Sequence, residues 1–197
     1  MPNMDGIEFC EKIKSNVETS HIPVILLTAK VDRDTKYESI ETGADDYIPK
    51  PFEIDYLKIR IKNLLQSREL LRKRFQNSYK LEPSSVTVNS VDEKFLSDLI
   101  SEMEAGIPDS DFSVSSLESK MGMSHANFYR KIKNLTGQSA QELLLSMRMK
   151  RARQIMSENG GIRISEIAYM VGFQNPNYFG KYFKKTFGKT PTEFLNQ

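Results

Sequence analysis

The C-terminal half of the sequence contains an internal repeat, and this repeat most limits the folds that the chain can adopt. Residues 117–144 align with residues 167–195, so that Phe128 matches Phe179 at a distance of 51 positions. Each copy closes with a serine or threonine followed three residues later by a glutamate, a helix-start signature. A duplication of this kind predicts two copies of one small structural unit.

Each copy has the pattern of a helix, a tight turn with a glycine and a second helix. This is the helix-turn-helix unit, whose second helix enters the major groove of DNA. We place the two units near residues 117–137 and 167–188. The side chains that share the apolar face of each second helix, and are expected to be buried, are Phe128, Ile132, Leu135, Phe179, Phe183 and Phe187.

The opposite faces of these helices carry side chains suited to reading DNA. Arginine and lysine pair with guanine in the major groove, and asparagine pairs with adenine. The candidates for base contacts are Ala126, Tyr129, Arg130, Asn177, Gly180 and Lys181. Since Gly180 has no side chain, base reading is expected to be weaker there. The candidates for phosphate contacts, which position the protein without specifying sequence, are Ser124, Lys131, Lys133, Lys184 and Lys185.

Charge is divided unevenly along the chain and supports this interpretation. Residues 117–197 carry 13 basic and five acidic side chains, a net charge of +8, within a chain whose total is +2. Such a concentration of positive charge suits a phosphate backbone. A helix over residues 139–158 is expected to join the two units.

The N-terminal third shows a different pattern. Its elements read as a helix over residues 7–15, a short apolar strand ending at Thr28, a helix over residues 33–42, a strand ending before Lys50 and a long helix from Phe52. This order is typical of an open parallel α/β sheet. The first strand is apolar on both faces and should be buried. Thr28 and Lys50 stand at the carboxyl ends of the strands, where chemistry gathers in such sheets.

Composition excludes several classes of protein. No apolar run approaches the roughly 20 residues of a membrane span, and the start of the chain lacks the order of a signal peptide. The single cysteine, Cys10, cannot form an internal disulfide, which indicates a reducing cytoplasm. With two histidines and one cysteine we expect no zinc site.

The motifs "MPNMDGIE", "PVILLTA" and "GADDYIPKPF" resemble the second half of a response-regulator receiver domain, over residues 1–66. The resemblance implies that Thr28 and Lys50 bind phosphoryl oxygens and that Tyr47 is the aromatic residue that changes rotamer on phosphorylation. It places the phosphoacceptor aspartate just before Met1. We therefore expect a partial receiver domain without a phosphoacceptor, in which Mg²⁺ would bind only if the receiver were complete.

Residues 91–197 resemble the AraC-type DNA-binding domain, most clearly in "IAYMVGFQNPNYFGKYFKKTFGKTP". Together with the connector "RELLRKRF", the order of the parts resembles hybrid sensor kinase/response regulators of Bacteroides type. That resemblance implies a cytoplasmic part of an inner-membrane protein.

Residues 67–90 are interpreted as a helical and then irregular linker. A heptad-like spacing, interrupted by Arg68 and Ser78, relates Leu57, Ile61, Leu64, Arg68, Leu71, Phe75 and Ser78. The first three of them suit packing on the receiver sheet, whereas Leu71 and Phe75 need another partner. A second copy of the helix is one candidate, and it would give a homodimer through residues 1–80.

The fold expected is therefore an α/β receiver remnant followed by an all-α domain with two helix-turn-helix units. The function expected is sequence-specific binding of double-stranded DNA and transcription regulation in a two-component phosphorelay, with RNA polymerase as a partner. The alternative is a phospho-signalling or dimerisation module that acts through protein contacts. We expect no enzyme activity, cofactor, metal or membrane contact in this chain.

Overall fold

The computed structural model describes residues 4–29, 42–78, 81–158 and 161–196. The predicted helix over residues 33–42 falls, except for its last residue, outside these ranges. The folded chain divides into two compact units. Unit 1 comprises residues 1–97 and 126–137, and unit 2 comprises residues 98–125 and 138–197. This division follows packing, so the domain boundaries at residues 66 and 90 stay predictions.

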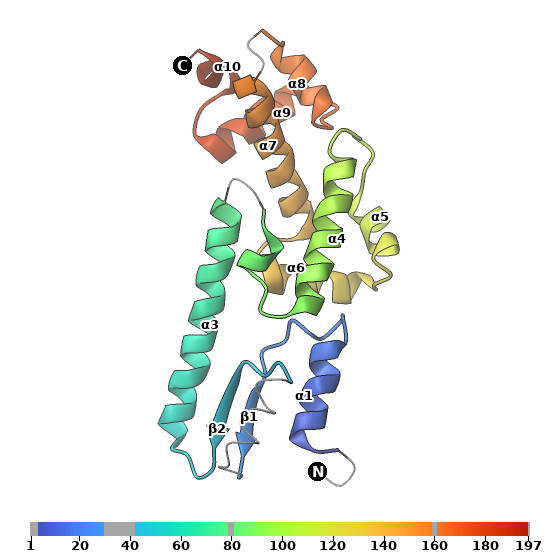
Figure 1. Cartoon of the computed structure of the whole chain (residues 1–197). Helices are drawn as coiled ribbons and strands as arrows, with labels where there is room; N and C mark the ends of the chain where they lie inside the picture. The colour runs from blue at the N-terminus through green and yellow to red at the C-terminus, as the bar shows by residue number, and fades with distance from the viewer. Residues whose placement is uncertain (1–3, 30–41, 79–80, 159–160, 197) are drawn as a thin grey trace. The chain divides into compact units, whose positions relative to one another are not determined.

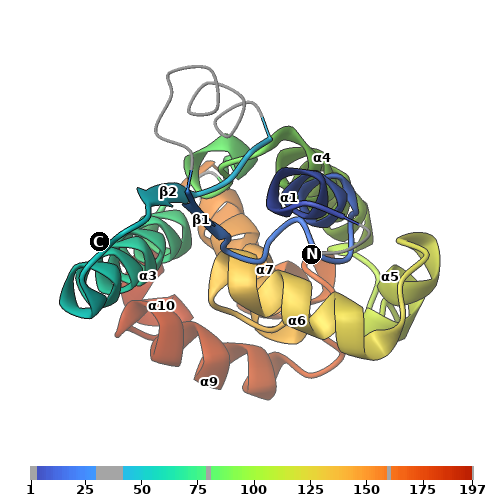
Figure 2. The same cartoon turned by 90° about the horizontal axis from the view of Figure 1, so that it is seen from below.

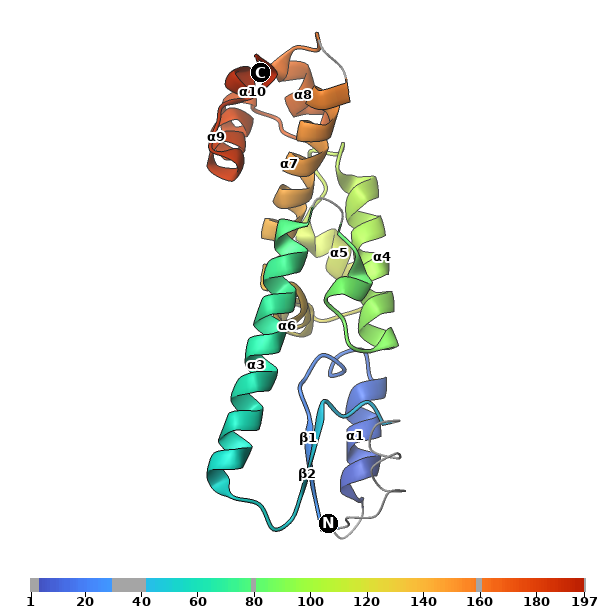
Figure 3. The same cartoon turned by 60° about the vertical axis from the view of Figure 1, so that its left-hand side comes forward.

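Unit 1 contains a parallel pair of strands, as the order of elements predicts. Strand β1 (Ile25–Thr28) pairs in parallel with β2 (Asp46–Pro49). Helices α1 (Gly6–Ser15) and α3 (Ile54–Asn77) lie on opposite sides of the pair (Figures 1, 2 and 3). The expectation that β1 is buried on both faces is wrong, since Leu27 is 41% exposed. In the described part of the chain β1 pairs with one strand, which leaves part of it uncovered.

The long helix continues past residue 66, as predicted. Arg60 on α3 binds Asp46 through two hydrogen bonds of 2.6 Å, from Nε and Nη2 to the two carboxylate oxygens. Such bidentate pairs fix geometry as well as contribute energy. The pair holds the N-terminal half of α3 along the start of β2.

A buried ion network fixes the loop between α1 and β1. Asp45 accepts hydrogen bonds from Lys14 (2.6 Å) and Arg68, and all three side chains are largely buried. The backbone N–H of Val24 adds a bond of 2.8 Å. Burial alone would raise the pKa of Asp45, but the bonds from Lys14 and Val24 and the charge of Arg68 hold it below its usual value. The Asp45 carboxylate is therefore a structural anchor.

The C-terminal end of α3 is covered by the chain itself. Phe75 is fully buried and Leu71 is half-buried, and a short 3₁₀ helix, η1 (Pro83–Ser85), lies against α3. A second copy of the helix is therefore not needed to cover Phe75.

Helix α4 (Ser90–Gly106) has a different cap from the Ser90–Glu93 box that the sequence suggests. The side-chain oxygen of Asn89 accepts from the N–H of Asp92 at 2.8 Å. Asparagine is as good an N-cap as serine, and Asn89 also donates to the Asp92 carboxylate at 2.9 Å. The helix thus starts at Ser90, one residue earlier than a cap at Ser90 would allow.

A second buried ion pair lies between α4 and α6 (His125–Thr136), within unit 1. The ammonium of Lys131 binds Asp92 Oδ1 and the hydroxyl of Ser20, the latter at 2.8 Å. Lys131 and Ser20 are fully buried and Asp92 is 1% exposed. The prediction that Lys131 contacts DNA phosphates is wrong in this structure, because its charge is turned inward and neutralised.

Unit 2 is helical. It contains α5 (Val114–Lys120), α7 (Ala140–Glu158), α8 (Ile164–Met170), α9 (Pro176–Phe187) and α10 (Pro191–Leu195). Helix α7 begins one residue after the predicted joining helix and ends where predicted. In the described residues no helix is long and apolar enough to span a membrane.

Both capping boxes predicted at the ends of the repeat copies are present. The N–H of Ser139 donates to the Glu142 carboxylate at 2.7 Å, and the N–H of Glu142 donates to the Ser139 hydroxyl at 3.3 Å. Thr190 and Glu193 make the same pair of bonds at 2.7 and 3.2 Å. These boxes start α7 and α10 and satisfy N–H groups that the first turns would leave unpaired.

The substitution Lys131→Met should lower the free energy of unfolding by about 3 kcal/mol or more, because it leaves the Asp92 carboxylate buried without its cation. Lys12→Met is the matched control. Lys12 pairs with Glu8 at the surface, where the side chains are 59% and 50% exposed, and such pairs contribute less than about 1 kcal/mol. Urea denaturation measures both. Equal losses would contradict the structural role of Lys131.

His21 should make the stability of unit 1 depend on pH. The side chain is 5% exposed; burial, and then the charge of Lys131, lower its pKa to about 4. In the unfolded chain His21 takes up a proton near pH 6.5, whereas in the folded chain it does so only near pH 4. The free energy of unfolding therefore falls as pH falls from 6.5 to 4. The loss attributable to His21 approaches about 3 kcal/mol at pH 4. Urea denaturation of His21→Phe should show a flatter profile between pH 6.5 and 4, and an unchanged profile would contradict the account.

Candidate nucleic-acid interface

The turn of the second helix-turn-helix unit is fixed by Gly172. It has φ of 75°, a left-handed conformation that favours glycine. A Cβ at this position would also collide with the carbonyl oxygen of Ile107 and lie 2.8 Å from the guanidinium of Arg148. The glycine predicted for the turn is therefore required twice, for backbone conformation and for space.

Both ends of α9 are capped as its sequence indicates. The Asn175 side chain accepts from the N–H of Asn177 at 2.9 Å, and Pro176 takes the first helical position, where no N–H is needed. At the other end Gly188 has φ of 76°, and its N–H donates to the backbone carbonyl of Lys184 at 2.8 Å. The sequence thus defines a helix of 12 residues with fixed ends.

The inner face of α9 is aromatic. Phe179 and Phe183 are fully buried, with ring centroids 5.7 Å apart, and Phe183 also packs on Phe194 of α10 at 5.7 Å. Phe187, predicted to be buried, is half-exposed. It lies in the last turn, where Phe183 (4.7 Å) and the guanidinium of Arg153 (5.6 Å) cover its ring.

The outer face of α9 carries the predicted DNA-reading residues. Asn177, Lys181, Lys184 and Lys185 are all exposed, and the first three lie on one side of the helix by its period. Gly180 is half-buried, and a Cβ there would meet no atom within 4 Å. The structure therefore has room for a side chain at this position, although the sequence supplies none.

On α6 the predicted faces are found with one exception. Phe128, Ile132 and Leu135 are buried, and Ala126, Tyr129, Arg130 and Lys133 are exposed. Lys131 lies on the buried side, as described above. The guanidinium of Arg130 binds its own helix, at the carbonyl of Ala126 (3.2 Å) and the side chain of Asn127. Ser124, in the segment before α6, is exposed.

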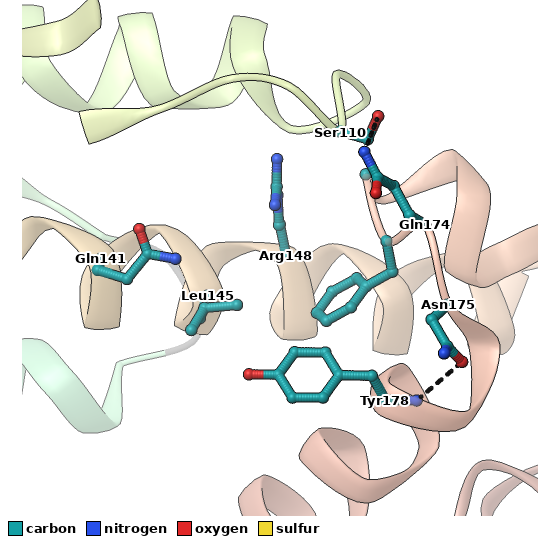
Figure 4. A pocket seen from close by; sticks show the side chains of 9 residues that line it. Ser110, Gln141, Leu145, Arg148, Gln174, Asn175 and Tyr178 are labelled. Carbon is teal, nitrogen blue, oxygen red and sulfur yellow. Dashed lines mark hydrogen bonds between the residues drawn. The ribbon is translucent and has the colours of Figure 1, made fainter. Parts of the chain in front are cut away.

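A pocket of about 420 Å³ lies beside the N-terminus of α9 within unit 2 (Figure 4). Its lining residues are Ser110, Gln141, Leu145, Arg148, Gly172, Phe173, Gln174, Asn175 and Tyr178. Arg148 crosses it and donates to the carbonyl of Asp109 at 2.6 Å, while burial lowers its pKa. Gln174 donates to Ser110 at 3.4 Å. The pocket walls thus tie α7 and the start of α9 to the loop before α5.

The sequence does not mark Arg148 as special, because it stands among several basic residues, in "SMRMKRAR". No feature of the pattern separates it from Arg151 or Arg153. The glycine at position 172 was the available signal, since a turn glycine also permits a side chain to approach the backbone.

The residues predicted to bind a phosphoryl group lie where expected on the sheet. Thr28 ends β1 and Lys50 follows β2, and the N–H of Lys50 donates to the carbonyl of Thr28 at 2.6 Å. Thr28 and Tyr47 are half-buried and Lys50 is exposed. Among the residues described, no group of three histidine, cysteine, aspartate or glutamate side chains could hold a metal ion.

Two known protein families match the two ends of the chain. Residues 1–62 match the response regulator receiver domain, and residues 117–197 match a helix-turn-helix domain. The chain is 27% identical to a crystal structure of an AraC-type transcriptional regulator from Chromobacterium violaceum, with a TM-score of 0.50. The match covers 55% of this chain and 96% of that one.

Among curated proteins, the whole chain is 40% identical over 197 residues to histidine kinase P4 of Formosa agariphila, but it spans 14% of that protein's length. The phosphate regulon regulatory protein PhoB of Pseudomonas aeruginosa is 44% identical over 66 residues, 34% of this chain and 29% of PhoB. The chain therefore joins response-regulator receiver sequence, in residues 1–62, to an AraC-type helix-turn-helix domain, in residues 117–197.

Proposed function

We propose that this chain binds a specific sequence of double-stranded DNA and regulates transcription as the output part of a two-component system. The observation that carries the proposal is the division of α9 into a buried aromatic face and an exposed face of Asn177, Lys181 and Lys184. The rigid inner face fixes the direction of the outer one, which site recognition requires. The second helix of such a unit is the one that enters the major groove.

Base reading and phosphate binding are assigned to different residues. Arg130 and Lys181 have the donors that suit guanine, and Asn177 has the amide that suits adenine. Lys133, Lys184 and Lys185 stand nearby as phosphate contacts, with Ser124 as a hydroxyl contact. Tyr129, which is 48% exposed, and Ala126 offer apolar contact with thymine methyl groups.

We propose that this chain is part of a hybrid sensor kinase, because it is similar over its whole length to histidine kinase P4. In that setting the chain acts at the chromosome, in the cytoplasm, and RNA polymerase is its partner. Thr28, Lys50 and Tyr47 then belong to the receiver's phosphoryl site, which also needs an aspartate and Mg²⁺. The DNA contacts assigned here use protein side chains alone, so we propose that binding needs no cofactor.

Dimerisation through residues 1–80 is a second proposal. It is supported by large apolar side chains on α3 that are exposed to solvent, such as Ile54 (68% exposed) and Leu65 (54% exposed). Contiguous exposed apolar surface marks interaction sites.

Arg130→Ala and Lys181→Ala should each weaken binding to a duplex enriched from a random library by about tenfold or more, because each removes a base contact worth about 1–3 kcal/mol. Binding to unrelated duplexes should change much less. Fluorescence anisotropy with competitor DNA measures both affinities. Arg151→Ala, an exposed arginine on α7, is the control. Wild-type affinity in both variants would refute the assignment.

Lys184→Ala and Lys185→Ala should weaken binding to all duplexes by similar factors, because phosphate contacts carry no sequence information. Each should reduce the slope of log affinity against log salt by about 1. Titrations at several salt concentrations give the slope. Lys62→Ala, which changes an exposed lysine on α3, is the control and should leave the slope unaltered. A loss confined to the enriched duplex would move these lysines to the base-reading group.

A further inference from the structure

The loop after α1 joins the receiver sequence to the first DNA-reading helix. This loop, residues 19–22, lies within unit 1, as does α6 from residue 126 onward. Ser20 is fully buried and His21 is 5% exposed. Both are therefore packed inside the unit although they belong to a loop.

On one side the loop is held by two cations, one on α1 and one on α3. Lys14 of α1 donates to the carbonyl of Ile22 at 2.9 Å, and Arg68 of α3 donates to the carbonyl of His21 at 2.8 Å. Both cations also bind Asp45. The loop therefore has a fixed position relative to α1, α3 and the start of β2.

On the other side the loop holds the ion pair of α4 and α6. Ser20 donates its hydroxyl proton to Asp92 Oδ1 at 2.6 Å and accepts from Lys131 at 2.8 Å. The Ser20 carbonyl also accepts from the Asn89 side chain at 3.3 Å. Hydrogen bonds between a hydroxyl and charged groups in a dry site are strong and directional, so Ser20 fixes the inner face of α6.

A second attachment lies at the end of α6. The last carbonyls of a helix lack partners within it, and α3 supplies two. Arg72 Nε donates to the carbonyl of Asn134 at 2.7 Å, and Gln76 Nε2 donates to that of Thr136 at 2.6 Å. Gly137 follows with φ of 74°, and a Cβ there would lie 2.6 Å from Gln76 Nε2. The C-terminus of α6 thus fits against α3 closely.

Neither attachment covers the DNA-reading face. Ala126, Tyr129, Arg130 and Lys133 stay exposed while Ser20, Arg72 and Gln76 bind the other side and the end of α6. The contacts therefore restrain the helix without blocking it. Ordering a binding element before the partner arrives reduces the free-energy cost of binding.

We propose that the receiver sequence and the part of α3 that continues beyond it position α6 for DNA through two attachments, Ser20 on the Asp92–Lys131 pair and Arg72 with Gln76 on the last turn. Movement of α3 or of the loop after α1 then changes the orientation of the first reading helix. The proposal rests on the proposed function and adds its regulation: the receiver controls the half-site that α6 reads.

The test is hydrogen exchange of the full chain, measured by mass spectrometry. Ser20→Ala removes two hydrogen bonds and Gln76→Ala removes one, so each should speed exchange in residues 126–136 by about fivefold or more. Exchange in residues 176–187 of unit 2 should stay the same. Ser15→Ala and Gln66→Ala replace exposed residues of α1 and α3 and are the matched controls. Unchanged exchange in residues 126–136, or an equal rise in residues 176–187, would overturn the proposal.

DNA binding gives the second readout. With a duplex enriched by the wild-type chain, Ser20→Ala and Gln76→Ala should lower affinity by about fivefold and weaken the footprint at one half-site only. Faster exchange in residues 126–136 with unchanged affinity would show that the contacts are merely structural and would overturn the proposal. If the wild-type chain enriches no duplex, the proposed function fails, while the exchange measurement still tests the attachment.

Discussion

The buried charge of Lys131 decides which way the first reading helix faces. An ammonium group without water needs a carboxylate and further acceptors, and Asp92 and Ser20 provide them. Rotating α6 to expose Lys131 would leave Asp92 buried and unpaired. The inward direction of Lys131 therefore fixes the outward direction of Arg130 and Lys133.

The second copy of the repeat achieves the same result by different means. The position that matches Lys131 at an offset of 51 is Tyr182, which is half-buried and takes part in no buried ion pair among the described contacts. Phe179 and Phe183, which match the buried Phe128 and Ile132 of α6, form its fully buried aromatic face. Burial raises the pKa of Tyr182, and Lys185 lies 5.5 Å from its ring. Both helices pack an apolar face, and α6 has a buried ion pair in addition, so the two reading helices differ in how they can be loosened. The helix held by the ion pair is the one that the receiver sequence contacts.

The sequence predicts those features that follow from local patterns. Helical spacing places Phe128, Phe179 and Phe183 inside, and glycines mark the turns, because these depend on neighbours in the chain. It could not assign Lys131, since a lysine close to the exposed Arg130 and Lys133 reads as solvated unless its distant partner is known. Asp92 stands 39 positions away and Ser20 is 111 positions away. Asp45 and Asp46 were likewise without a role, because their partners Lys14, Arg68 and Arg60 become neighbours only in the fold. The local pattern favours Ser90 over Asn89 as the cap of α4, because the Ser90–Glu93 pair gives the stronger signature. The base-reading set remains a prediction, as it depends on DNA.

Two helix-turn-helix units of one chain should read one stretch of duplex. A hydroxyl-radical footprint on a duplex enriched from a random library by the wild-type chain tests this. Two protected segments should appear on one face of the DNA, about one helical turn of roughly 10 base pairs apart. A single protected segment, or the absence of any enriched sequence, would contradict it.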